Sequence, residues 1–322
     1  MKPEIENILP PTLRGLVRSI PEPLTAHLEE IRVRLGRPLE VLSADKVLYL
    51  LPNGTVSKYY QAAYCPDMSD CEKLLSLVSN HSLYALEEEL KRGYVTIKGG
   101  HRIGLVGRVI VEGGEVRHLR NVSGFNIRVA REMKGVARKV IPFITDASGT
   151  CHNTLIVSPP QCGKTTLLRD LARCFSDGTE EYVTAKKVGI VDERSELAGS
   201  VDGIPQHDVG PRTDVLDACP KAEGMMMMIR SMSPDILVAD EIGRPEDVTA
   251  IDEAVHAGVR LITTVHGRDL EDISRRPTLS RMLQQAVFTR FVVLSKRLGT
   301  GTVEGVYDAA WQPVTEGRVH AM

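Results

Sequence analysis

Aromatic side chains are scarce in this chain, because they make up 4% of its 322 residues and include one tryptophan. The hydrophobic cores must therefore be built from Leu, Ile, Val, Ala and Met. Proteins that bind single-stranded nucleic acid stack the bases on aromatic side chains that alternate with basic ones. No such stretch occurs here, so the sequence gives no support for a module of that kind.

Long apolar runs are also missing. No run approaches the roughly 20 residues that a membrane-spanning helix requires, and Met1 to Glu4 do not begin a signal peptide. The six cysteines include no Cys-x-x-Cys pair, and the formal net charge is only −2. A charge this small makes no electrostatic case for nucleic-acid binding. We expect a cytoplasmic protein with reduced thiols.

The length suggests two domains, and the first of them shows short alternating strands separated by glycine turns. A helix is predicted over 67–79. The predicted strands are 30–35, 39–42, 46–51, 93–98, 102–111 and 124–130. Because hairpin turns join many of these strands, we expect residues 1–134 to form a small α+β domain with an antiparallel sheet.

From about residue 135 onward strands and helices alternate, which is the pattern of a parallel sheet with crossover helices. The predicted strands are 154–157, 188–191, 236–239 and 261–265, and the predicted helices are 164–175, 214–232, 246–257 and 278–286. Segments 288–294 and 301–307 are predicted to close the sheet as an antiparallel pair. We therefore expect an α/β domain over residues 135–322, joined to the first by a basic connector near 131–140.

The most informative segment lies between strand 154–157 and helix 164–175. It consists of Ser158, Pro159, Pro160, Gln161, Cys162, Gly163, Lys164 and Thr165, with Thr166 following in the helix. Its spacing is that of a phosphate loop, whose backbone N–H groups and helix N-terminus attract a nucleotide phosphate. We predict that Lys164 bridges the β- and γ-phosphates of ATP and that Thr165 ligates Mg²⁺. Ser158 stands where glycine is expected, and serine makes this turn without strain only at negative φ.

Two carboxylates, Asp240 and Glu241, follow the apolar strand 236–239. In an open α/β sheet ligands bind at the carboxyl ends of the strands. We predict that Asp240 holds Mg²⁺ and that Glu241 orients and deprotonates the attacking water. The alternative is that the pair only caps the next helix.

Two further strand ends bring polar side chains to the same edge. Glu193 follows strand 188–191, and His266 follows strand 261–265. His266 is a candidate sensor of the γ-phosphate, with a local hydrogen bond as its alternative. Glu193 is a candidate second acid, with a simple ion pair to Arg194 as its alternative.

Together these segments give the chain a specific resemblance to the stage III sporulation protein AA family, which is related to the hexameric secretion and pilus-retraction ATPases. The matching stretches are 30–38, 98–107, 126–132, 191–199, 208–216, 221–235, which contains four consecutive methionines, and 264–267. The family usually has Gly at the positions of Ser158 and Gln161. The resemblance covers nearly the whole chain.

The resemblance implies a RecA-like P-loop ATPase core of the AAA+ type, with a smaller N-terminal α+β domain that contributes arginines toward a nucleotide. The candidates for that contribution are Arg102, Arg108, Arg128 and Arg131. Strand alternation places Arg102 and Arg108 on one face, and separates Arg128 from Arg131. The resemblance also implies a homohexameric ring and membrane channel proteins of a sporulation complex as partners.

We therefore expect an ATP-hydrolysing motor subunit that acts in the cytoplasm, peripherally at the membrane, with no direct nucleic-acid partner. Two alternatives stay open. One is a nucleic-acid-dependent ATPase, because RecA-like cores also serve recombinases and helicases. The other is a nucleotide-gated scaffold with little hydrolysis, which the substitutions at Ser158 and Gln161 favour.

Overall fold

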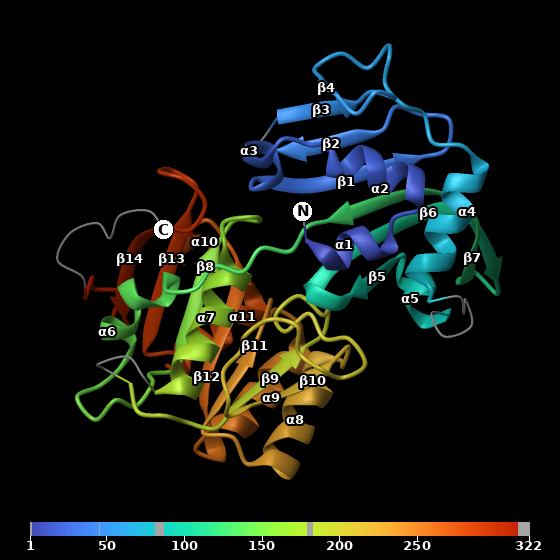
Figure 1. Ribbon diagram of the computed structural model, residues 1–322. Coiled ribbons are helices and arrows are strands. Elements are labelled where there is room, and N and C mark those ends of the chain that lie inside the picture. Colours follow the sequence, from blue (N-terminus) through green and yellow to red (C-terminus); the bar gives the residue numbers. More distant parts are fainter. Residues whose placement is uncertain (1, 45, 81–86, 179–182, 315–322) are drawn as a thin grey trace. The chain divides into compact units, whose positions relative to one another are not determined.

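The computed structural model describes residues 2–44, 46–80, 87–178 and 183–314 (Figure 1). The chain divides into two compact units, the N-terminal unit Met1–Arg131 and the C-terminal unit Glu132–Met322. The division falls three residues before the boundary that we expected between residues 134 and 135.

The N-terminal unit combines short helices with one antiparallel sheet. Its helices are α1 (Pro3–Ile8), α2 (Pro11–Arg18), α3 (Glu22–Thr25), α4 (Met68–Val78) and α5 (Glu87–Arg92). Its strands are β1 (Leu28–Arg34), β2 (Glu40–Ser43), β3 (Lys46–Leu50), β4 (Val56–Ser57), β5 (Tyr94–Ile97), β6 (His101–Glu112) and β7 (Glu115–Arg128). The predicted helix over 67–79 is α4, and it begins at a capping box in which Asp67 and Asp70 satisfy each other's backbone N–H groups.

The sheet of this unit has the strand order β4-β3-β2-β1-β7-β6-β5. One face buries Ile31, Val33 and Ile127 against a helical layer that includes α1, α2 and α4. Figure 1 shows α1 and α2 laid across this face. Because side chains alternate along a strand, the intervening Arg32 and Arg128 project from the other face and stay partly exposed.

Strands β6 and β7 form a long hairpin around a turn at Gly113-Gly114. The sequence predicted a strand only from residue 124, and this was wrong because β7 begins at Glu115. The ladder between the two strands shifts register twice, and Asn121 in β7 has a φ of +47°. Such bulges add residues to one strand and interrupt its alternation, which is the signal that sequence reasoning uses.

The C-terminal unit is an α/β fold. Its helices are α6 (Ile141–Ile144), α7 (Lys164–Asp177), α8 (Lys221–Met232), α9 (Pro245–His256), α10 (Leu270–Ser274) and α11 (Pro277–Gln284), with the 3₁₀ turn η3 (Val136–Lys139). Its strands are β8 (Thr154–Ser158), β9 (Val188–Asp192), β10 (Thr213–Asp217), β11 (Ile236–Ala239), β12 (Arg260–His266), β13 (Arg290–Ser295) and β14 (Thr302–Asp308).

The sheet of the C-terminal unit has the order β10-β9-β11-β12-β8-β13-β14, and all pairs are parallel except β13 with β14. The predicted closing antiparallel pair is therefore confirmed. On one face, Ile156 and its neighbours pack against η3, α6 and α7. On the other face, Leu155 and Val157 belong to the core that α8, α9, α10 and α11 cover. Both faces of the sheet are buried, which explains why its central strands read as continuous apolar runs.

The predicted helix over 214–232 was wrong in its first part. Residues Thr213–Asp217 form β10, which pairs with β9 at the edge of the sheet. Helix α8 starts only after Pro220, because a proline in a helix interior removes a hydrogen bond and clashes with the preceding turn. The four consecutive methionines of α8 divide between core and surface, since Met225 and Met228 are buried whereas Met227 is 53% exposed.

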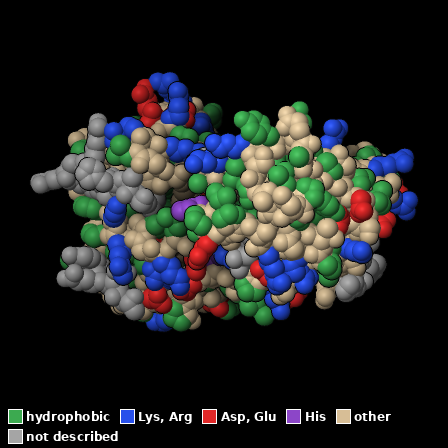
Figure 2. All heavy atoms as spheres, turned by 45° about the horizontal axis from the view of Figure 1, so that its top comes forward, with side chains coloured by type: hydrophobic (Ala, Val, Ile, Leu, Met, Phe, Trp, Pro, Cys, Tyr) green, Lys and Arg blue, Asp and Glu red, His purple; other side chains and the backbone are tan. Residues whose placement is uncertain are grey.

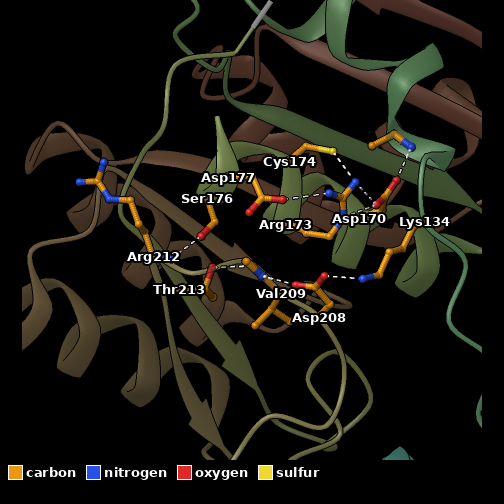
Figure 3. Close-up of polar contacts among 12 residues, drawn as sticks. Lys134, Asp170, Arg173, Cys174, Ser176, Asp177, Asp208, Val209, Arg212 and Thr213 are labelled. Atoms are coloured by element: carbon orange, nitrogen blue, oxygen red, sulfur yellow. Dashed lines mark hydrogen bonds and ion pairs between the residues drawn. The ribbon is translucent and has the colours of Figure 1, made fainter. Parts of the chain in front are cut away.

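The segment that enters the C-terminal unit is fastened to α7 and to the loop before β10 (Figure 3). Lys134 Nζ lies 2.5 Å from a carboxylate oxygen of Asp208, and the backbone N–H of Asp208 donates to Glu132. Farther along, the backbone N–H of Ala137 donates to the buried carboxylate of Asp170 in α7 at 2.8 Å. The connector is thus held against the C-terminal unit from Glu132 onward.

The surface seen in Figure 2 carries Lys and Arg side chains in several separate groups, with Asp and Glu side chains beside them. A nucleic-acid backbone is bound by a continuous basic surface, because neutralising phosphates supplies most of the affinity.

Within the described ranges, no helix combines the length and the apolar character that crossing a membrane takes.

Candidate functional site

The carboxyl ends of four neighbouring strands, β9, β11, β12 and β8, meet at one edge of the C-terminal sheet. The register aligns Ser158 at the end of β8 with His266 at the end of β12, and it aligns Ala239 of β11 with Val191 of β9. The sequence-predicted site residues of the C-terminal unit lie at these ends or in the segments that follow them. The topology therefore brings together segments that are more than 100 residues apart.

The phosphate loop connects β8 to α7. Ser158 is the last residue of β8, is fully buried and is not among the residues with positive φ. Gln161 and Gly163 instead adopt φ values of +58° and +84°. Of the two residues that replace the usual glycines, Gln161 and not Ser158 strains the backbone, because a non-glycine residue in the left-handed region costs about 1–2 kcal/mol.

Lys164 is the first residue of α7 and is 5% exposed. Its ammonium lies 3.4 Å from the carbonyl oxygen of Pro159 and 3.0 Å from Nδ1 of His266. Burial lowers the pKa of Lys164, and the negative charges of Asp240 and Glu241 oppose this shift. A buried cation with few fixed partners is suited to receive an anion.

The second residue of α7 contacts the acidic strand end. The hydroxyl of Thr165 donates to Oδ2 of Asp240 at 2.9 Å, and the hydroxyl of Thr264 in β12 donates to the other carboxylate oxygen. One hydroxyl and one carboxylate side by side are hard oxygen ligands of the kind that Mg²⁺ prefers. The pair therefore fits a magnesium ion that is completed by water and phosphate oxygens.

Glu241 has a φ of +54°, which is rare for a residue with a side chain. Its backbone N–H donates to the hydroxyl of Thr264 at 2.9 Å. Its two carboxylate oxygens are contacted by different residues, since His266 Nε2 lies 2.7 Å from one and Arg194 lies 2.9 Å from the other. The alternative in which the acidic pair caps the next helix was wrong, because the N-cap of α9 is Arg244 and the two carboxylates contact other residues, namely Thr165, Thr264, His266 and Arg194.

His266 therefore lies between the phosphate-loop lysine and the candidate catalytic carboxylate. An ammonium group can only donate hydrogen bonds, so His266 accepts from Lys164 at Nδ1. Its proton then sits on Nε2, from which it donates to Glu241. The three side chains form a continuous chain of hydrogen bonds across the sheet edge.

The loop after β9 is held by two residues that were not among the predicted site residues. Asp192 is 2% exposed and accepts the backbone N–H groups of three residues, Glu196, Leu197 and Ala198, at 2.8–3.0 Å. Burial raises the pKa of Asp192, while these three hydrogen bonds lower it. Arg169 of α7 donates to the carbonyl oxygens of Glu196 and Leu197. Nothing local in the sequence distinguishes this aspartate from Glu193 beside it.

Glu193 lies in an acidic cavity of about 80 Å³. The lining residues are Asp192, Glu193, Arg194, Glu196, Lys221, Asp240, Glu241 and Arg244. The alternative in which Glu193 pairs with Arg194 was wrong. Glu193 contacts Lys221 at 3.3 Å and Arg244 at 3.7 Å, whereas Arg194 contacts Glu241.

The candidate arginines of the N-terminal unit lie on its sheet. Arg102 and Arg128 are directly paired between β6 and β7. The guanidinium of Arg102 lies 3.4 Å from the centre of the Tyr94 ring, and Arg128 lies 3.5 Å from Glu30. Arg108 is exposed farther along β6. β7 ends at Arg128, so the alternation that we used to separate Arg128 from Arg131 does not reach Arg131. Contact of any of these arginines with a nucleotide stays a prediction.

Comparison with known proteins shows the family of the chain. The sequence profile of the family described as "Sporulation stage III, protein AA" matches residues 1–313. The chain is 50% identical to "Stage III sporulation protein AA" of Bacillus subtilis (strain 168) over 305 residues, which is 95% of this chain and 94% of that protein. It is 31% identical to "Uncharacterized protein ycf45" of Porphyra purpurea over 165 residues, covering 51% of this chain and 27% of that protein.

Two solved structures share the fold at low sequence identity. The ATPase DotB of Legionella pneumophila matches with a TM-score of 0.55 and 13% identity, over 87% of this chain and 74% of that chain. The pilus retraction motor PilT, solved with bound ADP, matches with a TM-score of 0.53 and 13% identity, over 84% of this chain and 75% of that chain. The chain belongs to the sporulation stage III protein AA family, and its core has the RecA-like fold of P-loop secretion and pilus ATPases.

Proposed function

We propose that this chain binds and hydrolyses ATP as a motor subunit of a sporulation-associated secretion or channel complex. The observation that carries the proposal is the 2.9 Å hydrogen bond between Thr165 and Asp240. It joins the phosphate loop to the acidic strand end, and these are the two elements that hydrolysing P-loop proteins use to hold a metal–nucleotide complex.

In this proposal the residues from Ser158 to Thr166 surround the phosphates, and the ammonium of Lys164 leaves His266 to contact the β- and γ-phosphates. Thr165 and Asp240 hold Mg²⁺. The ion would supply positive charge that offsets the charge developing on the phosphate oxygens. The buried position of Lys164 supports this role, because a desolvated cation interacts strongly with an incoming anion.

Glu241 is the proposed general base. It accepts a proton from water while the water oxygen bonds to the γ-phosphorus and the bond to the bridging oxygen of ADP breaks. Both oxygens of Glu241 are engaged by His266 and Arg194, so at least one of these contacts must open before the carboxylate can accept that proton. Glu193 is the proposed second acid beside the water.

The hydrogen bonds of His266 support a role as sensor of the γ-phosphate. Departure of Lys164 toward a nucleotide would free Nδ1 of His266 and change its hold on Glu241. We further propose a homohexameric ring in which Arg102, Arg108 or Arg128 reaches a nucleotide of a neighbouring subunit. An arginine supplied in this way raises phosphoryl-transfer rates by about 10³–10⁵ in GTPases.

The cellular part of the proposal rests on similarity. The family description and the Bacillus subtilis relative carry the sporulation stage in their names, and DotB and PilT are named as an ATPase and a motor. We propose a cytoplasmic subunit, peripheral at the membrane, whose N-terminal unit and C-terminal ATPase unit move relative to each other as ATP is spent. Membrane channel proteins would be its partners.

The test compares Mg-ATP binding and turnover on the same preparations of the wild type and Lys164→Ala. We expect the variant to lose turnover at least 100-fold. Lys187→Ala is the matched control, because Lys187 precedes β9 at the opposite edge of the same sheet. Turnover by Lys164→Ala at the wild-type rate would exclude the proposal.

Other outcomes of this experiment separate the alternatives. Tight binding without turnover by the wild type, even in its oligomeric form, would favour the nucleotide-gated scaffold. Stimulation of turnover by single-stranded DNA would favour the nucleic-acid-dependent ATPase.

A further inference from the structure

Lys221 is a buried lysine that lies between the two candidate catalytic acids. It is the first residue of α8, directly after Pro220, and only 7% of it is exposed. Its ammonium lies 2.7 Å from the backbone carbonyl oxygen of Glu241 and 3.3 Å from a carboxylate oxygen of Glu193. One side chain therefore connects the strand ends of β11 and β9.

A buried ammonium is costly to the fold unless it is paired and hydrogen-bonded, because it loses its hydration. Replacing such an ion pair by apolar side chains is often neutral or stabilising. The N-terminal end of α8 is also a poor place for a cation, because the helix dipole is positive there. Stability alone therefore does not account for a lysine at this position.

The backbone of Glu241 needs to be held in place. Its φ of +54° is an unfavourable conformation that persists only where the surroundings impose it. The N–H of Glu241 donates to Thr264 in β12, and its carbonyl oxygen accepts from Lys221 in α8. The two contacts hold the main chain of this residue from both sides, and this fixes the direction in which its carboxylate leaves the strand.

We propose that Lys221 is a positioning residue of the nucleotide site, which fixes the backbone of Glu241 and the carboxylate of Glu193 in one arrangement. This inference rests on the proposed function. Among the described residues no hydrogen bond or ion pair joins Lys221 to the phosphate loop or to Asp240, so we expect Lys221 to affect the hydrolytic step more than nucleotide affinity. It works through Glu241 and Glu193 and touches no reacting atom.

The primary test is Lys221→Met, which keeps most of the side-chain volume and removes the ammonium. We expect kcat for Mg-ATP to fall about 10–100-fold, because misplacement of a catalytic group by about 1 Å costs up to about 100-fold in rate. The Kd of a non-hydrolysable Mg-ATP analogue should stay within about threefold of the wild type, and Tm should be similar. A purely structural ion pair would change Tm and Kd together with kcat.

Lys187→Met is the matched control. The ammonium of Lys187 lies 2.5 Å from the carbonyl oxygen of Ser233, which precedes β11. Lys187, like Lys221, therefore donates to a backbone carbonyl oxygen next to β11, but it does so at the edge of the sheet away from the site. We expect its kcat and Kd to equal those of the wild type.

If Lys221→Met does not fold, Lys221→Leu provides the test, because it also removes the donor to the Glu241 carbonyl oxygen and to Glu193 and leaves no unpaired polar group in its place. Wild-type kcat in either folded variant overturns the inference. A fall in kcat that comes with a similar rise in Kd and a lower Tm also overturns it. Absence of turnover in the wild type, in contrast, contradicts the proposed function itself. The two failures are therefore distinguishable.

Discussion

Acidification is predicted to destabilise the N-terminal unit through one histidine. His101, the first residue of β6, is fully buried. Its Nδ1 accepts the backbone N–H of Ala130 at 2.9 Å, and its buried Nε2 has no hydrogen-bond partner among the residues that the structure describes. Burial lowers the pKa of His101 from 6.5 to about 4, with a smaller contribution from the charge of Lys2 and an opposing one from Glu4.

The direction of the pH effect depends on whether the folded or the unfolded chain binds the proton more tightly. The folded chain has the lower pKa, so protonation favours the unfolded chain. The stability of the fold that depends on a neutral His101 is fully present above pH 6.5 and is lost as the pH falls toward 4. A shift of one pKa unit corresponds to about 1.4 kcal/mol, so the free energy of unfolding falls by about 2–2.5 kcal/mol between pH 7 and pH 4.5 on account of this residue.

The assay is urea unfolding followed by far-ultraviolet circular dichroism at both pH values. His101→Asn removes the titrating ring and offers an amide oxygen to the N–H of Ala130, so the variant should lose about 2 kcal/mol less on acidification than the wild type. The exposed His27 provides the control, because His27→Asn should behave as the wild type. Equal losses in the wild type and His101→Asn would refute the reasoning.

Three further changes have expected outcomes. Asp240→Asn should raise the Mg²⁺ concentration needed for half-maximal nucleotide binding by about 10-fold or more, by analogy with losses at other metal sites. A magnesium titration that matches the wild type would contradict the magnesium assignment. Gln161→Gly should raise the free energy of unfolding by up to about 1 kcal/mol, because relief of the positive φ outweighs the added freedom of the unfolded chain; a lower stability in urea would argue against strain at this position. Gly189→Ala should lower the free energy of unfolding by about 1–3 kcal/mol, because the added Cβ would lie 2.5 Å from the Met228 side chain. In contrast, a Cβ added at Gly15 would have no atom within 4 Å, so Gly15→Ala should raise the free energy of unfolding by about 0.5–1 kcal/mol in the same urea assay.

Local signals in the sequence were sufficient to predict the central strands and the loop that joins β8 to α7. The segments 154–157, 188–191 and 236–239 are short, apolar and followed by polar residues, and each is a strand of the parallel sheet. The edge strand β10 was missed because Thr213–Asp217 is only partly buried and has no continuous apolar run. The proline at position 220 is a signal that could have divided the predicted helix 214–232.

The contacts that shape the candidate site could not be predicted from the sequence, because they join distant segments. Arg169 reaches a loop 27 residues later in the chain, and Lys221 reaches Glu241 across two elements. Sequence proximity even suggested the wrong partner for Glu193, because Arg194 turns to Glu241. Residue types and strand ends identify a candidate site, but only the fold determines which charges pair.

The attachment of the connector to α7 has a mechanical consequence. Helix α7 begins at Lys164 in the phosphate loop, and six residues later its Asp170 accepts the backbone N–H of Ala137. At 1.5 Å per residue these two points are about 9 Å apart along one helix axis. Under the proposed function, a displacement of the first turn of α7 by a phosphate would also displace the residues that follow the N-terminal unit, because one short helix holds both points. The proposed phosphate site and the connector are therefore attached to the same two turns of one helix, with no other element between them.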